Sequence, residues 1–227
     1  MSRFPNFADV RQRQFCCYCG CSTETRDHVP AKVFLDKPYP PDLPTVYACR
    51  SCNEKVSLDE EYLACLIECA SNGIADPQRI ERDKIKSILQ KKSALALKCN
   101  QVCKALMGGE LSSADLKRVN NVVLKLARGH SVYELNEPRF DAPSHLAFIP
   151  FPSMDAKSRA NYEALPRSVV FPEVGSRSMQ RLVENVPGVS LWVTVQPKRY
   201  RYLSSINSRV IIRIVISEYL ACEVVWS

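Results

Sequence analysis

Two Cys-x-x-Cys pairs near the N-terminus constrain the fold of this chain more than any other feature. Cys16 and Cys19 form the first pair, and Cys49 and Cys52 form the second after a gap of 29 residues. Each short turn, or knuckle, can aim two thiolates at one point, so two knuckles can close a tetrahedral zinc site. The sequence therefore predicts a structural zinc ion bound by these four cysteines, in a segment too short for a core of its own.

Seven further cysteines need a different explanation. The sequence opens without the apolar stretch of a secretory signal, so we expect an intracellular, cytoplasmic protein. There, metal sites and buried thiols are more common than disulfides. Two cysteines flank the first knuckle and four form i,i+4 pairs: Cys17 and Cys21, then Cys65/Cys69 and Cys99/Cys103. No histidine or carboxylate accompanies the helical pairs in a ligand-like pattern, so we interpret them as small buried hydrophobes, with a second metal site as the alternative.

The composition is ordinary, but the charge is unevenly spread. The chain has 227 residues, 46% hydrophobic and 24% charged, as in a soluble protein of one large or two small domains. No apolar run approaches the roughly 20 residues that a membrane helix needs. The formal charge of +7 lies outside residues 1–62, which carry 8 basic and 9 acidic side chains. The knuckles and the positive charge mark different modules, and the charge indicates an anionic partner.

The pattern of apolar residues divides the chain into three segments. Residues 1–72 hold the knuckles, residues 73–140 have helical periodicity, and residues 141–227 have short β-branched runs separated by turns. Together they predict an α+β fold with an N-terminal zinc-stapled domain, a helical middle segment and a C-terminal antiparallel β-sheet.

Start and stop signals refine the helices. The expected helices cover about 58–71, 78–107 and 114–128. Ser57 and Glu60 fit a capping box at the start of the first helix. Ser113 is the expected N-cap of the third helix, and Gly129 is expected to end it.

Alternating apolar residues predict the strands of the C-terminal sheet. The candidates are Leu146–Pro150, Ser168–Phe171, Ser190–Gln196, Tyr200–Leu203, Val210–Ser217 and Ala221–Trp226. The clearest alternation places four aliphatic side chains on one face: Val210, Ile212, Ile214 and Ile216. A helix around 176–184 is expected between strands.

The insert between the knuckles carries the residues best suited to chemistry. Asp27 and His28 are adjacent, and in an extended strand their side chains point to opposite faces. One can therefore bind a metal ion while the other acts on a water molecule. Asn53 directly follows the last knuckle cysteine and offers an amide oxygen, a hard ligand suited to Mg²⁺.

These phrases together resemble the HNH endonucleases, also called ββα-metal nucleases, in their zinc-bearing form. The resemblance covers about residues 14–62 and rests on CxYCG, RDHVPAK and ACRSCN, followed by SLDEEY. It implies that His28 is the general base and that Asp27 and Asn53 bind one catalytic Mg²⁺ or Mn²⁺ ion. It also implies that the four knuckle cysteines bind the structural zinc.

One position departs from the family pattern. The family often has an asparagine about five residues before the third cysteine, and it helps to orient the catalytic imidazole. Here Pro44 occupies that position and Thr45 follows. A backbone carbonyl or Thr45 is therefore expected to hold His28 instead.

Several basic residues are candidates for nucleic-acid contact. Arg26, Lys32 and Arg50 lie closest in sequence to the proposed catalytic residues. The segment 197–202 interleaves Lys198, Arg199 and Arg201 with two tyrosines, which suits either base stacking or an ordinary hairpin with packed tyrosines. The lysine series over 84–104 suits either a phosphate-binding face or a solvated helix surface.

The leading hypothesis is an HNH-type endonuclease that hydrolyses nucleic-acid phosphodiesters, with DNA as the favoured substrate. The alternative is a non-catalytic zinc module that binds nucleic acid or a partner protein, and a third hypothesis is a cysteine-based redox sensor. The C-terminal β-rich region could serve self-association or a partner protein. Phage defence, mobile-element transfer and repair are all compatible roles.

Overall fold

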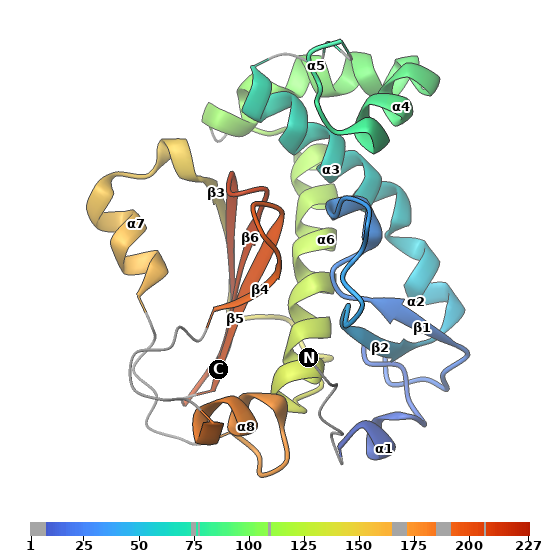
Figure 1. Ribbon diagram of the computed structural model, residues 1–227, viewed down its shortest axis with the longest axis vertical. Helices are drawn as coiled ribbons and strands as arrows, with labels where there is room; N and C mark the ends of the chain where they lie inside the picture. The colour runs from blue at the N-terminus through green and yellow to red at the C-terminus, as the bar shows by residue number, and fades with distance from the viewer. Residues whose placement is uncertain are drawn as a thin grey trace.

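The computed structural model describes residues 8–73, 76, 78–108, 110–164, 172–184, 192–206 and 208–227. It confirms the α+β class: an N-terminal β-hairpin with a cysteine cluster, a helical middle and a C-terminal antiparallel sheet of five strands (Figure 1). The predicted strand Ser168–Phe171 lies outside the described residues.

The N-terminal part is a hairpin followed by a short helix. It comprises α1 (Ala8–Gln12), β1 (Thr25–His28), the 3-10 turn η1 (Lys32–Phe34), β2 (Thr45–Ala48) and α2 (Arg50–Lys55). Strands β1 and β2 are antiparallel, and His28 pairs with Thr45. The insert between them is anchored because Phe34 and Leu35 are fully buried in the core.

The helical middle contains four helices, and the two predicted N-terminal caps differ from those observed. They are α3 (Ser57–Asn72), α4 (Asp83–Lys91), α5 (Ser93–Gly108) and α6 (Ser113–His130). The predicted capping box is wrong, because Ser57 donates to the carbonyl of Glu54 instead. The stretch 78–107 is two helices, broken at Lys92. Helix α6 is capped by Ser112 rather than Ser113.

The C-terminal sheet has the strand order β3-β7-β6-β5-β4. Its elements are η2 (Ser131–Leu135), β3 (His145–Pro150), η3 (Phe151–Ser153), α7 (Ala156–Glu163), α8 (Arg177–Glu184), β4 (Val193–Gln196), β5 (Tyr200–Ile206), β6 (Val210–Ile216) and β7 (Leu220–Trp226). The predicted alternation in β6 is confirmed, since its four aliphatic side chains on one face are all buried. On the opposite face, Val215 packs with Phe151 near α7.

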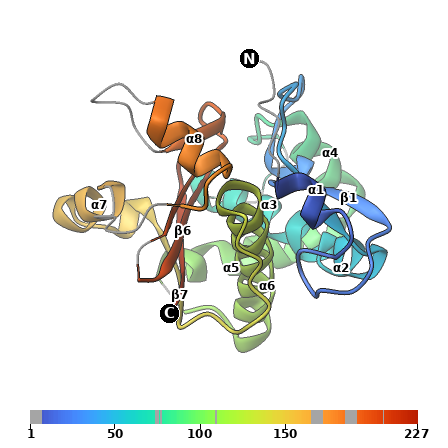
Figure 2. The same ribbon diagram turned by 90° about the horizontal axis from the view of Figure 1, so that it is seen from below.

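Helix α6 lies between the C-terminal sheet on one side and the N-terminal hairpin on the other, as both views show (Figures 1 and 2). A single cluster of buried side chains therefore draws on all three sequence segments. Whether those segments are separate domains stays a prediction. Among the helices that the structure describes, none has the length and apolarity needed to cross a bilayer.

Gly129 does not end α6 as predicted; it lies inside the helix at its closest approach to the hairpin. A Cβ atom at Gly129 would lie 2.7 and 2.9 Å from the two methyl groups of Val29, the residue after His28. The helix therefore packs directly against the strand end that carries His28.

We expect Gly129→Ala to destabilise the protein by about 1–3 kcal/mol, because the overlap with Val29 outweighs the better helix propensity of alanine. Thermal unfolding measures the change. Gly108→Ala is the matched control, since no atom lies within 4 Å of a Cβ built there. Equal melting temperatures for the two variants would contradict the close packing of α6 on Val29.

Candidate metal centre and active site

The four knuckle cysteines form one cluster. The Sγ atoms of Cys16, Cys19, Cys49 and Cys52 all lie within 4.8 Å of one another. The Cys19–Cys49 separation is 3.8 Å, which matches the edge of a tetrahedron with zinc–sulfur bonds of about 2.3 Å. The structure thus brings together the predicted zinc ligands, and their geometry fits a structural zinc ion.

Backbone hydrogen bonds shape the two knuckles. The N–H of Gly20 donates to the carbonyl of Cys16 at 2.8 Å, and the N–H of Cys52 donates to Sγ of Cys49 at 3.4 Å. The second contact lowers the pKa of the Cys49 thiol, whereas burial raises the pKa of Cys52. Cys17 is buried outside the cluster, and Cys21 is exposed outside it.

The later cysteines belong to the core. Cys65, Cys69, Cys99, Cys103 and Cys222 are each at most 2% exposed. Their burial agrees with the interpretation as small hydrophobes.

Strand β1 separates the two residues expected to perform chemistry. Asp27 is only 7% exposed and faces the protein interior, whereas His28 is partly exposed on the opposite face of the strand. Thr45 lies directly across from His28, in the place predicted for an orienting residue. The carbonyl of Pro44 accepts from the N–H of Val29 at 2.9 Å.

Asp27 has an unexpected partner in the middle of α6. The ammonium of Lys125 lies 2.9 Å from Oδ2 of Asp27 and 2.9 Å from Oε1 of Glu60. It also donates to the backbone carbonyl of Asn53 at 3.2 Å. The hydroxyl of Tyr18 donates to the same Asp27 oxygen at 3.0 Å. Three oxygens therefore surround one buried cation.

This arrangement shifts the pKa values of Glu60 and Lys125. Burial raises the pKa of Glu60, and the charge of Lys125 only partly opposes that rise. For Lys125, burial acts to lower the pKa, but the two carboxylates outweigh it and the pKa is raised. The lysine is thus held as a cation by Glu60 and Asp27.

Asn53 is placed on the same side of β1 as Asp27. Its side-chain amide donates to Oγ1 of Thr25 at 3.1 Å, and Thr25 shares a strand face with Asp27. Lys125 contacts the side chain of Asp27 and the backbone carbonyl of Asn53. Hard oxygen donors of this kind suit Mg²⁺ or Mn²⁺, although here the cation among them is an ammonium.

The six predicted nucleic-acid contacts fall into three groups. Arg26 is exposed on the hairpin with its guanidinium 4.9 Å from the Tyr47 ring, and Arg50 is exposed at the start of α2. Lys198 is exposed at the β4–β5 turn. Lys32 and Arg199 lie elsewhere, near a cavity described below.

Arg201 is bound within the sheet region. It pairs with Glu163 and Glu218, each at 2.7 Å. The neighbouring tyrosines, Tyr200 and Tyr202, are at most 1% exposed. The structure therefore supports the hairpin interpretation of 197–202 over base stacking.

The net charge of a segment does not distinguish Lys125 from the other lysines; its position on one face of α6 does. Val122, Leu126 and Gly129 follow helical spacing on one side of α6, and Lys125 falls on that buried side. A lone cation on an apolar stripe signals a buried carboxylate partner.

No protein-family model matches the chain, and the comparisons with curated proteins and with solved structures find no match either. What the fold and the cluster define is an α+β protein with a four-cysteine cluster, suited to a metal ion, beside an N-terminal β-hairpin.

Proposed function

We propose that the protein is an HNH-type endonuclease that hydrolyses phosphodiester bonds of nucleic acid, with DNA as the favoured substrate. The observation that carries the proposal is the ββα arrangement: His28 ends β1, and Asn53 follows the last knuckle cysteine within α2, the helix after β2. The ammonium of Lys125 bridges the carboxylate of Asp27 and the backbone carbonyl of Asn53. The resemblance of residues 14–62 to HNH sequences supports the same conclusion.

In this proposal, His28 accepts a proton from the attacking water, because imidazole titrates near neutral pH. Thr45, across the strand pair, holds the imidazole in place. Arg26 and Lys32 hold the scissile strand through its phosphates. Asp27 and Asn53 are the residues that would bind Mg²⁺ or Mn²⁺, with Glu60 as an added carboxylate. Such an ion, when bound, neutralises charge on the leaving oxygen.

We expect His28→Ala to lower the rate of plasmid cleavage by about 10²–10⁴-fold, the usual contribution of a general base. Cleavage is measured with Mg²⁺, with Mn²⁺ and with EDTA. His145→Ala is the matched control, because His145 is exposed on β3, far along the chain from the hairpin. A folded, zinc-loaded protein whose cleavage equals that of His28→Ala would refute the proposal.

One observation favours the second candidate function, a zinc module that binds nucleic acid without cutting it. Lys125 already neutralises Asp27 in the interior, so the divalent ion has a competitor inside the protein. The module predicts binding that survives both His28→Ala and Asp27→Asn, with no metal-dependent turnover. The same cleavage assay, with a binding assay beside it, separates the two functions.

A further inference from the structure

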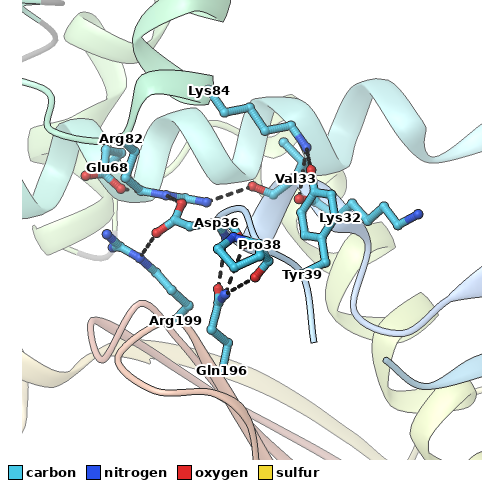
Figure 3. A network of polar contacts seen from close by, with 10 residues as sticks. All are labelled: Lys32, Val33, Asp36, Pro38, Tyr39, Glu68, Arg82, Lys84, Gln196 and Arg199. Atoms are coloured by element: carbon cyan, nitrogen blue, oxygen red, sulfur yellow. Dashed lines mark hydrogen bonds and ion pairs between the residues drawn. The ribbon is translucent and has the colours of Figure 1, made fainter. Parts of the chain in front are cut away.

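A cavity of about 590 Å³ lies where three distant parts of the chain converge. Its walls come from the insert after His28, from the start of α4 and from the β4–β5 turn (Figure 3). Its lining residues are Leu35, Asp36, Lys37, Tyr39, Glu81, Arg82, Asp83, Lys84 and Arg199. A volume of this size falls within the roughly 300–1,000 Å³ of small-ligand sites.

Asp36 fixes the walls of this cavity to one another. It accepts hydrogen bonds from Nε of Arg82 and from Nε of Arg199, which come from the other two walls (Figure 3). Gln196 adds two hydrogen bonds to the Asp36 backbone, at 2.8 and 3.0 Å. Burial acts to raise the pKa of Asp36, but the two guanidinium groups outweigh it and lower that pKa. The one carboxylate at the centre is therefore ionised and neutralised by arginine.

Two lysines of the cavity wall have no carboxylate partner among the described residues, so their ammonium groups can bind an anionic ligand. In the part of the chain that the structure describes, neither Lys37 nor Lys84 has a carboxylate within ion-pair distance. Lys84 donates instead to the carbonyl of Lys32 and to the hydroxyl of Tyr39. Arg199 pairs through Nε with Asp36, and among the described residues no other carboxylate lies within ion-pair distance of its guanidinium. Its terminal NH₂ groups can therefore bind a ligand. Glu81, Asp83 and Lys37 are exposed, whereas Lys84 and Arg199 are partly buried.

An aromatic ring accompanies the cations. Tyr39 lines the cavity, and the ammonium groups of Lys32 and Lys84 lie 5.5 and 5.7 Å from its ring centroid. Cations beside an aromatic face are the combination with which proteins hold single-stranded nucleic acid: the ring stacks a base and the cations take the phosphate. A duplex keeps its bases paired and cannot stack one of them on the ring of Tyr39.

We infer that this cavity binds one nucleotide of a single-stranded segment, with its phosphate at Lys37, Lys84 and Arg199 and its base against Tyr39. The assignment of a nucleic-acid ligand rests on the proposed function. Lys32 comes four residues after His28, and its carbonyl accepts a hydrogen bond from Lys84 of the cavity wall. In this proposal the cavity therefore holds the strand beside the point of cleavage.

The test measures binding without cleavage. The full-length His28→Ala protein is titrated against a fluorescein-labelled thymidine 20-mer and against the matched duplex, in a buffer without chelator or added divalent ions, at several salt concentrations. We expect Lys37→Ala and Lys84→Ala each to weaken single-strand binding severalfold and to lower the salt slope by roughly 0.7. Tyr39→Leu should weaken it roughly fivefold or more, and Tyr39→Phe should not.

Lys117→Ala and Lys157→Ala are the matched controls, since both residues are exposed and lie outside the cavity. Lys37 is exposed, so its variant tests the cavity even where Lys84→Ala perturbs the fold. Cavity variants that bind like the controls overturn the inference, and so does a duplex that binds as tightly as the single strand. Equal competition by inorganic phosphate and by thymidine monophosphate overturns the assignment to a nucleotide.

This result is independent of the cleavage assay. Loss of binding in the cavity variants together with an inactive wild-type protein refutes the nuclease and keeps the cavity. An active wild-type protein with unchanged binding in the cavity variants refutes the nucleotide site in the cavity and supports the nuclease.

Discussion

Replacing Cys19 with serine is expected to remove the zinc ion and to unfold the hairpin that carries His28. The four sulfurs converge on one point, and Cys19 is exposed, so its replacement removes a ligand with little loss of packing. Structural zinc contributes about 10–16 kcal/mol of apparent binding free energy in small zinc modules. A whole domain is stable by only about 5–15 kcal/mol. The ion is therefore expected to decide whether the N-terminal part folds.

The strands of the hairpin are too short to keep it folded without the zinc ion. Strands β1 and β2 have four residues each, and an isolated two-stranded hairpin is marginal in water. Phe34, Leu35 and Val46 join the common core, so loss of the hairpin also exposes apolar surface of the helices behind it. We expect a lower melting temperature for the whole chain, and not only local fraying.

Cys21→Ser is the control for this prediction. Cys21 is exposed two residues away and lies outside the cluster. Bound zinc per chain, measured by elemental analysis, and the melting temperature are compared for both variants and the wild type. A Cys19→Ser protein that keeps its zinc and melts with Cys21→Ser would contradict the four-cysteine site, and so would a wild-type protein purified without zinc.

Local patterns account for the parts of the molecule that could be predicted. The knuckle spacing predicts the cluster because a Cys-x-x-Cys turn fixes two thiolates by itself. The alternation from Val210 to Ile216 predicts β6 because a two-residue period has one structural meaning. Both signals lie within a few residues of the feature that they specify.

Contacts that cross the chain could not be predicted in this way. Glu60 fits a helix N-terminus by its sequence, but its partner Lys125 is 65 residues away. Gly129 has the sequence character of a helix stop, and only the approach of Val29 explains its place inside α6. The cavity is the strongest case, because Asp36 and Arg199 are 163 residues apart. Docking of α6 and of the β4–β5 turn, rather than local propensity, sets these features.

Lys125→Met is expected to destabilise the protein by about 3–5 kcal/mol, the usual cost of removing one partner from a buried ion pair. The side chains of Lys125, Asp27 and Glu60 are at most 9% exposed, so the two carboxylates would face each other with little water between them. In a chain of this size the melting temperature should fall by about 6–20 °C. Lys117→Met is the control on the same helix, because Lys117 is exposed, and it should change stability by less than about 0.5 kcal/mol.

A second substitution separates charge from packing. Adding Glu60→Gln to Lys125→Met removes one of the two uncompensated carboxylates and leaves Asp27 with its hydrogen bond from Tyr18. We expect the double variant to recover part of the lost stability. A double variant less stable than Lys125→Met alone would show that packing of the lysine stem, and not its charge, sets the cost.

The same variant tests what kind of site the lysine occupies. Without the ammonium, oxygens of Asp27, Glu60 and Asn53 still surround the vacated position, and such oxygens are the ligands that Mn²⁺ prefers. An ion that binds only the folded protein adds about 2.7 kcal/mol when its concentration is 100 times its dissociation constant. We therefore expect Mn²⁺ to raise the melting temperature of Lys125→Met by several degrees and that of Lys117→Met much less. An equal response of the two variants would mean that these oxygens do not form a divalent site. That result would favour the non-catalytic module, in which Asp27 pairs with Lys125 and binds no metal ion.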